Sequence, residues 1–185
     1  MKVILRFMKS DAFINRYEEN RLYERSYYMN PARWEDAIGH IPEIQDAAQW
    51  TEPIKYMDGT NTHVSDSIRE LPEDTGGIYM FFIQGPTLPF IERYIAYIGR
   101  AQFTDSQNIR KRANEYFPES QRADSRPKIA NMFKHWKPYL YFQYFPCKDN
   151  TVIQRCEANL IHAIIPPFND DIPENIIIQN PQNAF

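Results

Sequence analysis

The order of apolar segments beyond residue 70 limits the available folds more than any other feature of this chain. These segments, bounded by proline and glycine, are strands at 78–83 and 90–98, helices at 106–117 and 127–136, a strand at 139–145 and a helix at 151–165. The first two strands are consecutive, so they predict an antiparallel hairpin. The whole order predicts an α/β domain with a small, mainly antiparallel three-stranded sheet flanked by helices.

The first 65 residues show a different pattern. Residues 1–9 suggest a short strand, and Ser10 or Asp11 is a plausible N-cap for a helix. Pro31 is well placed to open a second helix, and the residues from 51 to 65 resemble a linker. At 185 residues the chain can hold one domain and an extension. The predicted parts are a mostly helical accessory region at 1–65, the α/β domain at 66–175 and a C-terminal tail at 176–185.

Charge is unevenly distributed along the chain. The net charge is −3, yet residues 93–137 hold ten basic and four acidic residues, a net +6. Such a segment could contact a phosphate backbone or form an ordinary solvated helical face. No apolar run is long enough to span a bilayer, and the first nine residues do not resemble a signal peptide, so a cytoplasmic location is expected. The two cysteines and four histidines lack the spacing of metal ligands and are interpreted as structural residues.

Glu157 is the most informative single residue. Within the predicted helix it lies among Ile153, Leu160, Ile161 and Ile164, which form an apolar stripe. Burying an unpaired carboxylate is costly, so Glu157 must face a metal ion or an arginine. A simple ion pair with Arg112 or Arg155 is an open alternative to a metal site.

Two tyrosine tripeptides and a basic helix provide further candidate groups. Tyr79 and Tyr97 lie on the two hairpin strands, where an aromatic residue usually belongs to the core. Arg112 and Tyr116 are one helical turn apart and can point at the same spot. Arg112 is permanently charged and has a planar fork of donors that suits a phosphoryl oxygen.

Five short motifs, taken in order, resemble the GIY-YIG nuclease superfamily, and in particular the N-terminal incision module of the bacterial excision-repair nuclease subunit. The resemblance covers residues 68–172. The motifs are Leu71-Pro72 with Gly77-Ile78-Tyr79, Tyr97-Ile98-Gly99-Arg100-Ala101, Ile109-Arg110-Lys111-Arg112 with Tyr116-Phe117, Glu157-Ala158-Asn159-Leu160-Ile161, and Pro166-Pro167-Phe168-Asn169. Each motif is weak alone, but their order is specific.

The resemblance implies a role for each matching residue. Tyr79 and Tyr97 would position or activate the attacking water, Tyr116 would complete the water network, and Arg112 would hold the scissile phosphate. Arg100 stands where the repair module carries a lysine and would be a second cationic contact. Glu157 would bind a single Mg²⁺ or Mn²⁺ ion, and Asn169 would orient groups of the site. The residues Arg110 and Lys111 are expected to contact phosphates outside the site.

These observations predict a divalent-metal-dependent endonuclease that hydrolyses DNA, with RNA left open as a target. The alternatives are a catalytically weak module of the same fold that binds nucleic acid or protein, and an aromatic-rich structural protein without a ligand. The acidic accessory region at 1–65 favours protein contact, either in a homodimer or with a partner protein. No membrane association is expected.

Overall fold

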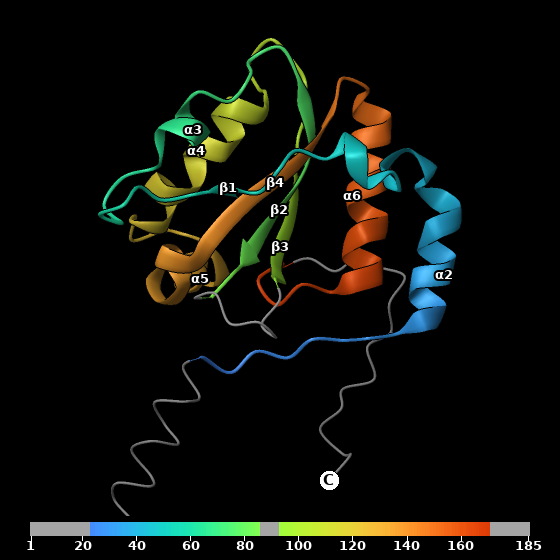
Figure 1. Ribbon diagram of the computed structural model, residues 1–185, viewed down its shortest axis with the longest axis horizontal. Coiled ribbons are helices and arrows are strands. Elements are labelled where there is room, and N and C mark those ends of the chain that lie inside the picture. Colours follow the sequence, from blue (N-terminus) through green and yellow to red (C-terminus); the bar gives the residue numbers. More distant parts are fainter. Residues whose placement is uncertain (1–22, 86–92, 171–185) are drawn as a thin grey trace, which may run out of the picture.

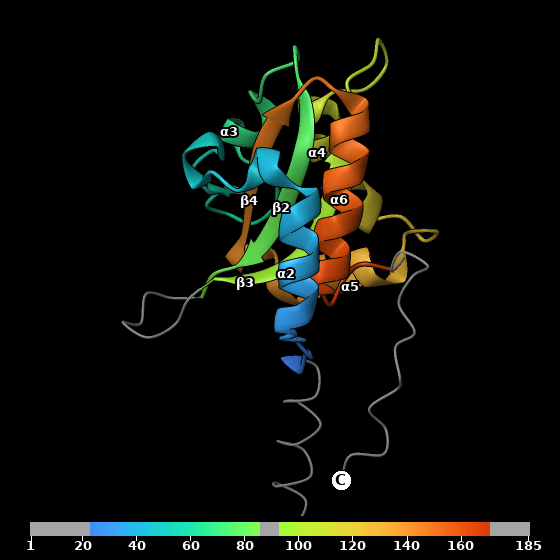
Figure 2. The same ribbon diagram turned by 90° about the vertical axis from the view of Figure 1, so that its right-hand side faces the viewer.

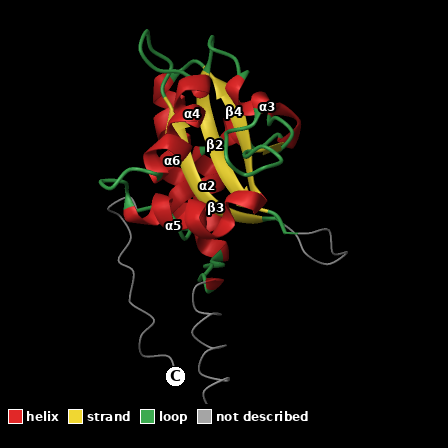
Figure 3. Cartoon of the chain, turned by 90° about the vertical axis from the view of Figure 1, so that its left-hand side faces the viewer, coloured by secondary structure: helices red, strands yellow, loops and turns green. Residues whose placement is uncertain are grey.

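The computed structural model describes residues 23–85 and 93–170 of the chain. It is an α/β structure in which a central sheet lies between two groups of helices (Figures 1 and 3). In chain order the elements are α2 (Pro31–His40), η1 (Pro42–Ile44), η2 (Ala47–Gln49), β1 (Ile54–Lys55), α3 (Asp66–Arg69), β2 (Gly76–Ile83), β3 (Tyr94–Ala101), α4 (Ile109–Ser120), α5 (Pro127–Trp136), η3 (Lys137–Tyr139), β4 (Leu140–Cys147) and α6 (Asn150–Ile164).

Among the described residues the sheet has four antiparallel strands in the order β1-β4-β2-β3, so the prediction of three strands was wrong. The additional strand, β1, lies in the stretch that was interpreted as a linker. It has only two residues, Ile54 and Lys55, which pair with Phe142 and Tyr141 of β4. Two residues are too few to show a period of two, so this pairing leaves no signal in the local sequence. The predicted order of two strands, two helices, a strand and a helix from residue 76 onward is confirmed.

Each face of the sheet has its own core. On one face, sheet residues such as Tyr79 and Phe81 pack with Tyr116 of α4 and Phe133 of α5. On the other face, sheet residues such as Ile78 and Met80 pack with α6, and α2 packs against α6 in turn (Figure 2). Successive side chains of a strand point to opposite faces. The continuous apolar run of β2 therefore serves both cores at once.

Helix boundaries mostly follow local signals, but α4 departs from the prediction at both ends. It begins at Ile109, after the N-cap Asn108, and not at residue 106. The helix α5 spans the predicted residues 127–136, and α2 begins as predicted at Pro31. Asn30 precedes it, and its side chain accepts a hydrogen bond from the backbone N–H of Ala32 at 3.1 Å. The prediction that Pro118 ends α4 was wrong, because the helix continues to Ser120. Pro118 has no N–H to donate. The last turn is nevertheless closed by a hydrogen bond from the N–H of Gln121 to the carbonyl oxygen of Pro118, at 3.2 Å.

Part of the predicted accessory region packs onto the rest of the domain. The hydroxyl of Tyr56 donates to the carbonyl oxygen of Ala113 in α4 at 2.6 Å, and both residues are buried. The strand predicted at 1–9, the helix predicted to start at Ser10 or Asp11, and the tail at 176–185 lie outside the described residues. None of the described helices combines the length and apolar character needed to cross a bilayer.

Candidate active site

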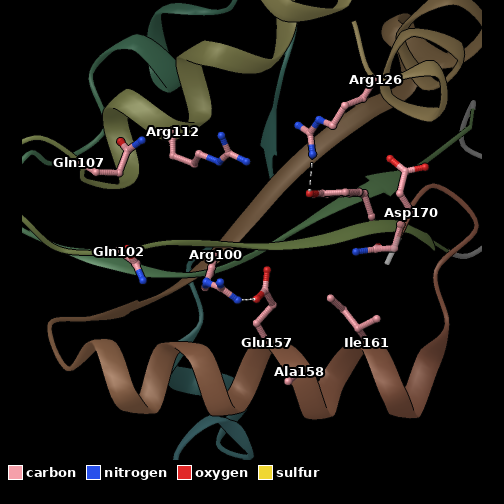
Figure 4. Close-up of a pocket in the computed structure, with 11 residues that line it drawn as sticks. Arg100, Gln102, Gln107, Arg112, Arg126, Glu157, Ala158, Ile161 and Asp170 are labelled. Atoms are coloured by element: carbon pink, nitrogen blue, oxygen red, sulfur yellow. Dashed lines mark hydrogen bonds and ion pairs between the residues drawn. The ribbon is translucent and has the colours of Figure 1, made fainter. Parts of the chain in front are cut away.

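An open pocket of about 590 Å³ lies beside β3, the last strand of the sheet that the described residues form. The helices α4 and α6 cover opposite faces of the sheet, and side chains from both reach the pocket at this edge (Figure 4). The pocket is lined by Tyr97, Arg100, Gln102, Gln107, Arg112, Arg126, Glu157, Ala158, Ile161, Asn169 and Asp170. Five of the predicted site residues are among them: Tyr97, Arg100, Arg112, Glu157 and Asn169.

Three tyrosine hydroxyls form a hydrogen-bonded chain behind the pocket. The hydroxyl of Tyr79 bonds to that of Tyr116, which donates to the hydroxyl oxygen of Tyr97 at 3.3 Å. The Nε of Arg112 donates to the hydroxyl oxygen of Tyr79 at 3.1 Å. The predicted convergence of these four side chains is therefore present in the structure.

The donor and acceptor roles along this chain of tyrosine hydroxyls distinguish Tyr97 from the other two. Tyr116 has one hydroxyl proton and uses it on Tyr97, so Tyr79 must be the donor in the bond between Tyr79 and Tyr116. Tyr97 lines the pocket, and its own proton is not used by another member of this chain. It can therefore donate into the pocket. Burial raises the pKa of Tyr79 and of Tyr116, which keeps both phenols protonated and unsuited to act as bases at neutral pH.

Two motif glycines are needed because of close contacts. Gly99 pairs across the strands with Tyr79, and a Cβ atom at Gly99 would lie 2.5 Å from the Tyr79 hydroxyl oxygen. Gly77 has a φ of +150° and leaves no room for a Cβ atom beside the carbonyl oxygen of Phe145. The absence of side chains at these positions lets Tyr79 lie flat over β3 and lets β2 pass close to β4.

Glu157 forms an ion pair with Arg100, a residue on the neighbouring edge strand. The open alternative of a pair with Arg112 or Arg155 is therefore not what the structure shows, because Arg155 pairs with Glu43 and Arg112 pairs with Glu115. The side chain of Glu157 is only 15% exposed. Burial raises the pKa of Glu157, and the positive charges of Arg100 and Arg112 oppose this effect.

Asn169 supports the edge strand from the far end of the pocket. Its Oδ1 accepts from the backbone N–H of Ile98 at 3.0 Å, and its Nδ2 donates to the carbonyl of Ile98 at 2.8 Å. Both bonds are buried, and together they satisfy the backbone of a residue next to Tyr97. The orienting role of Asn169 in the site stays a prediction, and these two bonds show which backbone groups it holds.

Arg110 and Lys111 lie outside the pocket. Arg110 bonds to the carbonyl of Leu71 and pairs with Glu73 at 2.9 Å. The Nζ of Lys111 donates to the carbonyl of Ser106 at 3.2 Å. Their phosphate contacts stay a prediction, and Arg112 is the residue of this helix that faces the tyrosines.

Several lining residues were missed by the sequence prediction, and Arg126 is the most important of them. It was counted only as part of the +6 segment. Its Nη1 donates to the hydroxyl oxygen of Tyr97 at 3.4 Å. The available sequence signal was an arginine just before Pro127, at the start of the helix that follows the tyrosine-bearing one. Gln102 and Gln107 gave no comparable signal.

The donor set suits a divalent ion held by one protein carboxylate. The carboxylate of Glu157 points from α6 into the pocket, and Asp170 lies at the far end of the pocket, away from Glu157 (Figure 4). Across residues 23–85 and 93–170, no three or more His, Cys, Asp or Glu side chains gather in a metal-binding group. Mg²⁺ retains several waters and needs only one or two carboxylates together with phosphate oxygens. Glu157 fits that role, while a multi-histidine or multi-cysteine metal centre does not fit this pocket.

Comparisons of the chain with protein-family models, with curated proteins and with solved structures found no significant match. The geometry of the pocket is therefore what bears on its chemistry.

Proposed function

We propose that this protein is a divalent-metal-dependent endonuclease of the GIY-YIG type that hydrolyses DNA phosphodiester bonds. One observation carries the proposal: a carboxylate from α6, guanidinium groups from β3 and α4, and a phenol from β3 all line the same pocket at the edge of the sheet. A carboxylate for a metal ion, a fixed cation for the phosphate and a hydroxyl for water are the groups that phosphodiester hydrolysis needs.

Each side chain is suited to a specific part of this reaction. The guanidinium of Arg112 is held by Tyr79 on one nitrogen and by Glu115 at 2.9 Å on another, so it is fixed in place before the substrate arrives. It would offset the negative charge that grows on the scissile phosphate. The hydroxyl of Tyr97 would orient the attacking water, because its oxygen is held by Tyr116 and its proton is free to be donated into the pocket.

Glu157 would hold the divalent ion, which when bound would stabilise the leaving oxygen of the phosphodiester. Arg100 would balance the charge of the Glu157 carboxylate before the ion binds, and would then be released toward the phosphate. Metal binding and substrate binding are therefore expected to involve the same ion pair.

The test is cleavage of supercoiled plasmid and of labelled branched DNA with Mg²⁺ or Mn²⁺. We expect Glu157→Gln to lower the cleavage rate by about 1,000-fold, in line with the loss of a group that stabilises transition-state charge. The matched control is Glu43→Gln, since Glu43 also pairs with an arginine but does not line the pocket. Absence of cleavage by the wild type, or equal cleavage by Glu157→Gln, would overturn the proposal.

The Arg100–Glu157 ion pair favours a second candidate, a nucleic-acid-binding module with little catalysis. In that case the carboxylate is satisfied by Arg100 alone and needs no ion. Calorimetry with Mn²⁺ separates the two candidates. The endonuclease predicts heat that disappears in Glu157→Gln, whereas the binding module predicts DNA binding without such heat.

A further inference from the structure

Arg126 is held rigidly at the rim of the pocket. Its Nε and Nη2 bond to the two carboxylate oxygens of Glu119 at 2.6 and 3.1 Å, and its Nη1 donates to the Tyr97 hydroxyl at 3.4 Å. Such a two-point pair fixes the plane of a guanidinium. Arg126 is also the N-cap residue of α5, yet its side chain makes no capping bond to that helix. The side chain points into the pocket instead (Figure 4).

Arg126 and Arg112 lie at opposite ends of the tyrosine chain. Arg112 donates to Tyr79 and Arg126 donates to Tyr97, while Tyr116 lies between these two phenols. Both guanidinium carbons lie over the ring of Tyr116, at 5.0 and 5.5 Å from its centroid. The pocket therefore has two cations on the side opposite α6, each aligned by a different tyrosine (Figure 4).

The bonds of Arg126 leave it able to bind an anion. A guanidinium has five N–H donors, and three of those in Arg126 are used by Glu119 and Tyr97. Two donors remain among the contacts of the described residues. Glu119 is not a lining residue, so its carboxylate holds the guanidinium from behind and does not fill the pocket. An arginine that served only as an ion-pair partner would not need to face the open space.

We propose that Arg126 binds a second phosphate of the substrate strand, adjacent to the scissile phosphate that Arg112 holds. This inference rests on the proposed function. It also narrows the substrate: two aligned guanidinium groups suit consecutive phosphates of a polynucleotide strand better than a single terminal phosphate or a mononucleotide. Glu119 is then a positioning residue, since it acts through Arg126.

The experiment measures the salt dependence of DNA binding by fluorescence anisotropy, with a labelled duplex and with EDTA to prevent cleavage. Each phosphate contact adds about 0.9 to the slope of log affinity against log salt for duplex DNA, and about 0.7 for a single strand. We expect Arg126→Gln to reduce the slope by about that amount and Arg126→Lys to restore it. With Mg²⁺ present, Arg126→Gln should raise KM more than it lowers kcat.

The matched control is Arg155→Gln. Arg155 also pairs with a glutamate and has a similarly exposed side chain, 45% against 36% for Arg126, but it does not line the pocket. Its removal should leave the slope unchanged. A thermal unfolding scan of each variant shows whether it is folded.

A measurement on the wild type does not depend on the folding of any variant. Phenylglyoxal modifies accessible arginines, and peptide mapping by mass spectrometry reports each site separately. DNA should protect Arg126 from modification and leave Arg155 reactive. Equal modification of Arg126 with and without bound DNA would overturn the inference.

The outcomes also separate this inference from the proposed function. If the wild type cuts DNA but Arg126→Gln keeps the wild-type slope, only the role of Arg126 is wrong. If Arg126 contributes to the slope but nothing is cut, the endonuclease proposal fails and the phosphate contact stands. If the wild type does not bind DNA even at low salt, both are overturned.

Discussion

Replacing Tyr116 with phenylalanine would delete one oxygen atom from the centre of the tyrosine chain. Tyr116 is fully buried, and its hydroxyl bonds to Tyr79 and donates to Tyr97 at 3.3 Å. Without that oxygen the hydroxyl proton of Tyr79 loses its acceptor in a buried site. An unpaired buried donor costs roughly 1–3 kcal/mol. We expect Tyr116→Phe to lower the free energy of unfolding by about 2 kcal/mol, which for a chain of this size lowers Tm by about 4–8 °C.

The same variant should affect cleavage more strongly than stability. Tyr116 holds the oxygen of Tyr97 in place, although it does not line the pocket itself. Loss of this support would let the phenol of Tyr97 turn away from the attacking water. A misplacement of about 1 Å can lower a rate by about 100-fold, and we expect a decrease of that order for Tyr116→Phe.

Tyr56→Phe is a matched control in the same core. Tyr56 is also fully buried, and its hydroxyl donates to the carbonyl of Ala113 at 2.6 Å, but it does not line the pocket. It should lose about 1 kcal/mol of stability, the usual value of one hydrogen bond. Its cleavage rate should equal that of the wild type.

The assays are urea unfolding, for stability, and single-turnover cleavage of a labelled duplex with Mg²⁺, for activity. Wild-type cleavage by Tyr116→Phe would falsify a role for the tyrosine chain in the site. Equal losses of activity in Tyr116→Phe and Tyr56→Phe would attribute the effect to general destabilisation. Unchanged stability of Tyr116→Phe would contradict the buried hydrogen bonds.

Two further predictions concern the strand pairing and the carboxylate. Gly99→Ala places a Cβ atom 2.5 Å from the Tyr79 hydroxyl oxygen, so it should lower the free energy of unfolding by about 1–3 kcal/mol. Gly39 is helical and has no atom within 4 Å of an added Cβ, so Gly39→Ala should be neutral or stabilising in the same urea experiment. Burial raises the pKa of Glu157 in the metal-free protein, and only the ionised form can hold a cation, so the affinity for Mn²⁺, measured by calorimetry, should increase with pH over a range above the pKa of an ordinary glutamate. The same raised pKa means that folding favours the neutral acid. In the metal-free protein, the neutral form of Glu157 therefore contributes stability that is complete below the pKa of the unfolded state. This contribution is lost as the pH rises through the pKa of the folded state. Measuring Tm against pH for the wild type and for Glu157→Gln checks the sign.

Much of the fold could be predicted because most elements have their own local signals. Pro127 opens α5, and Asn30 with Pro31 opens α2, so both starts are marked in the sequence. The strand β1 has no such mark, since its two residues form a strand only by pairing with β4. The end of α4 was misplaced for a related reason. Pro118 removes one backbone donor, but the hydrogen bond from Gln121 to the Pro118 carbonyl closes a further turn, so the helix continues past the proline.

The site was predicted less completely than the fold, because the sequence did not show which side chains pair with each site residue. The periodicity of α6 showed that Glu157 lies among apolar residues and needs a cation, but it could not show which one. The partner, Arg100, comes from a strand, and the candidates considered were helical. Arg126 was missed because its role depends on Glu119 and Tyr97, which are brought to it only by the fold.

The position of the pocket at the edge of the sheet explains how groups from both faces can share it. Tyr97 is on the α4 side of β3 and Arg100 is on the α6 side, as alternation along a strand requires for residues three apart. In the centre of a sheet, the strands on either side would separate these side chains. Since β3 is the last strand of the described sheet, both can reach past it to the same space. The proposed substrate strand would therefore approach from this edge, between α4 and α6. An added β-strand at β3 would block it.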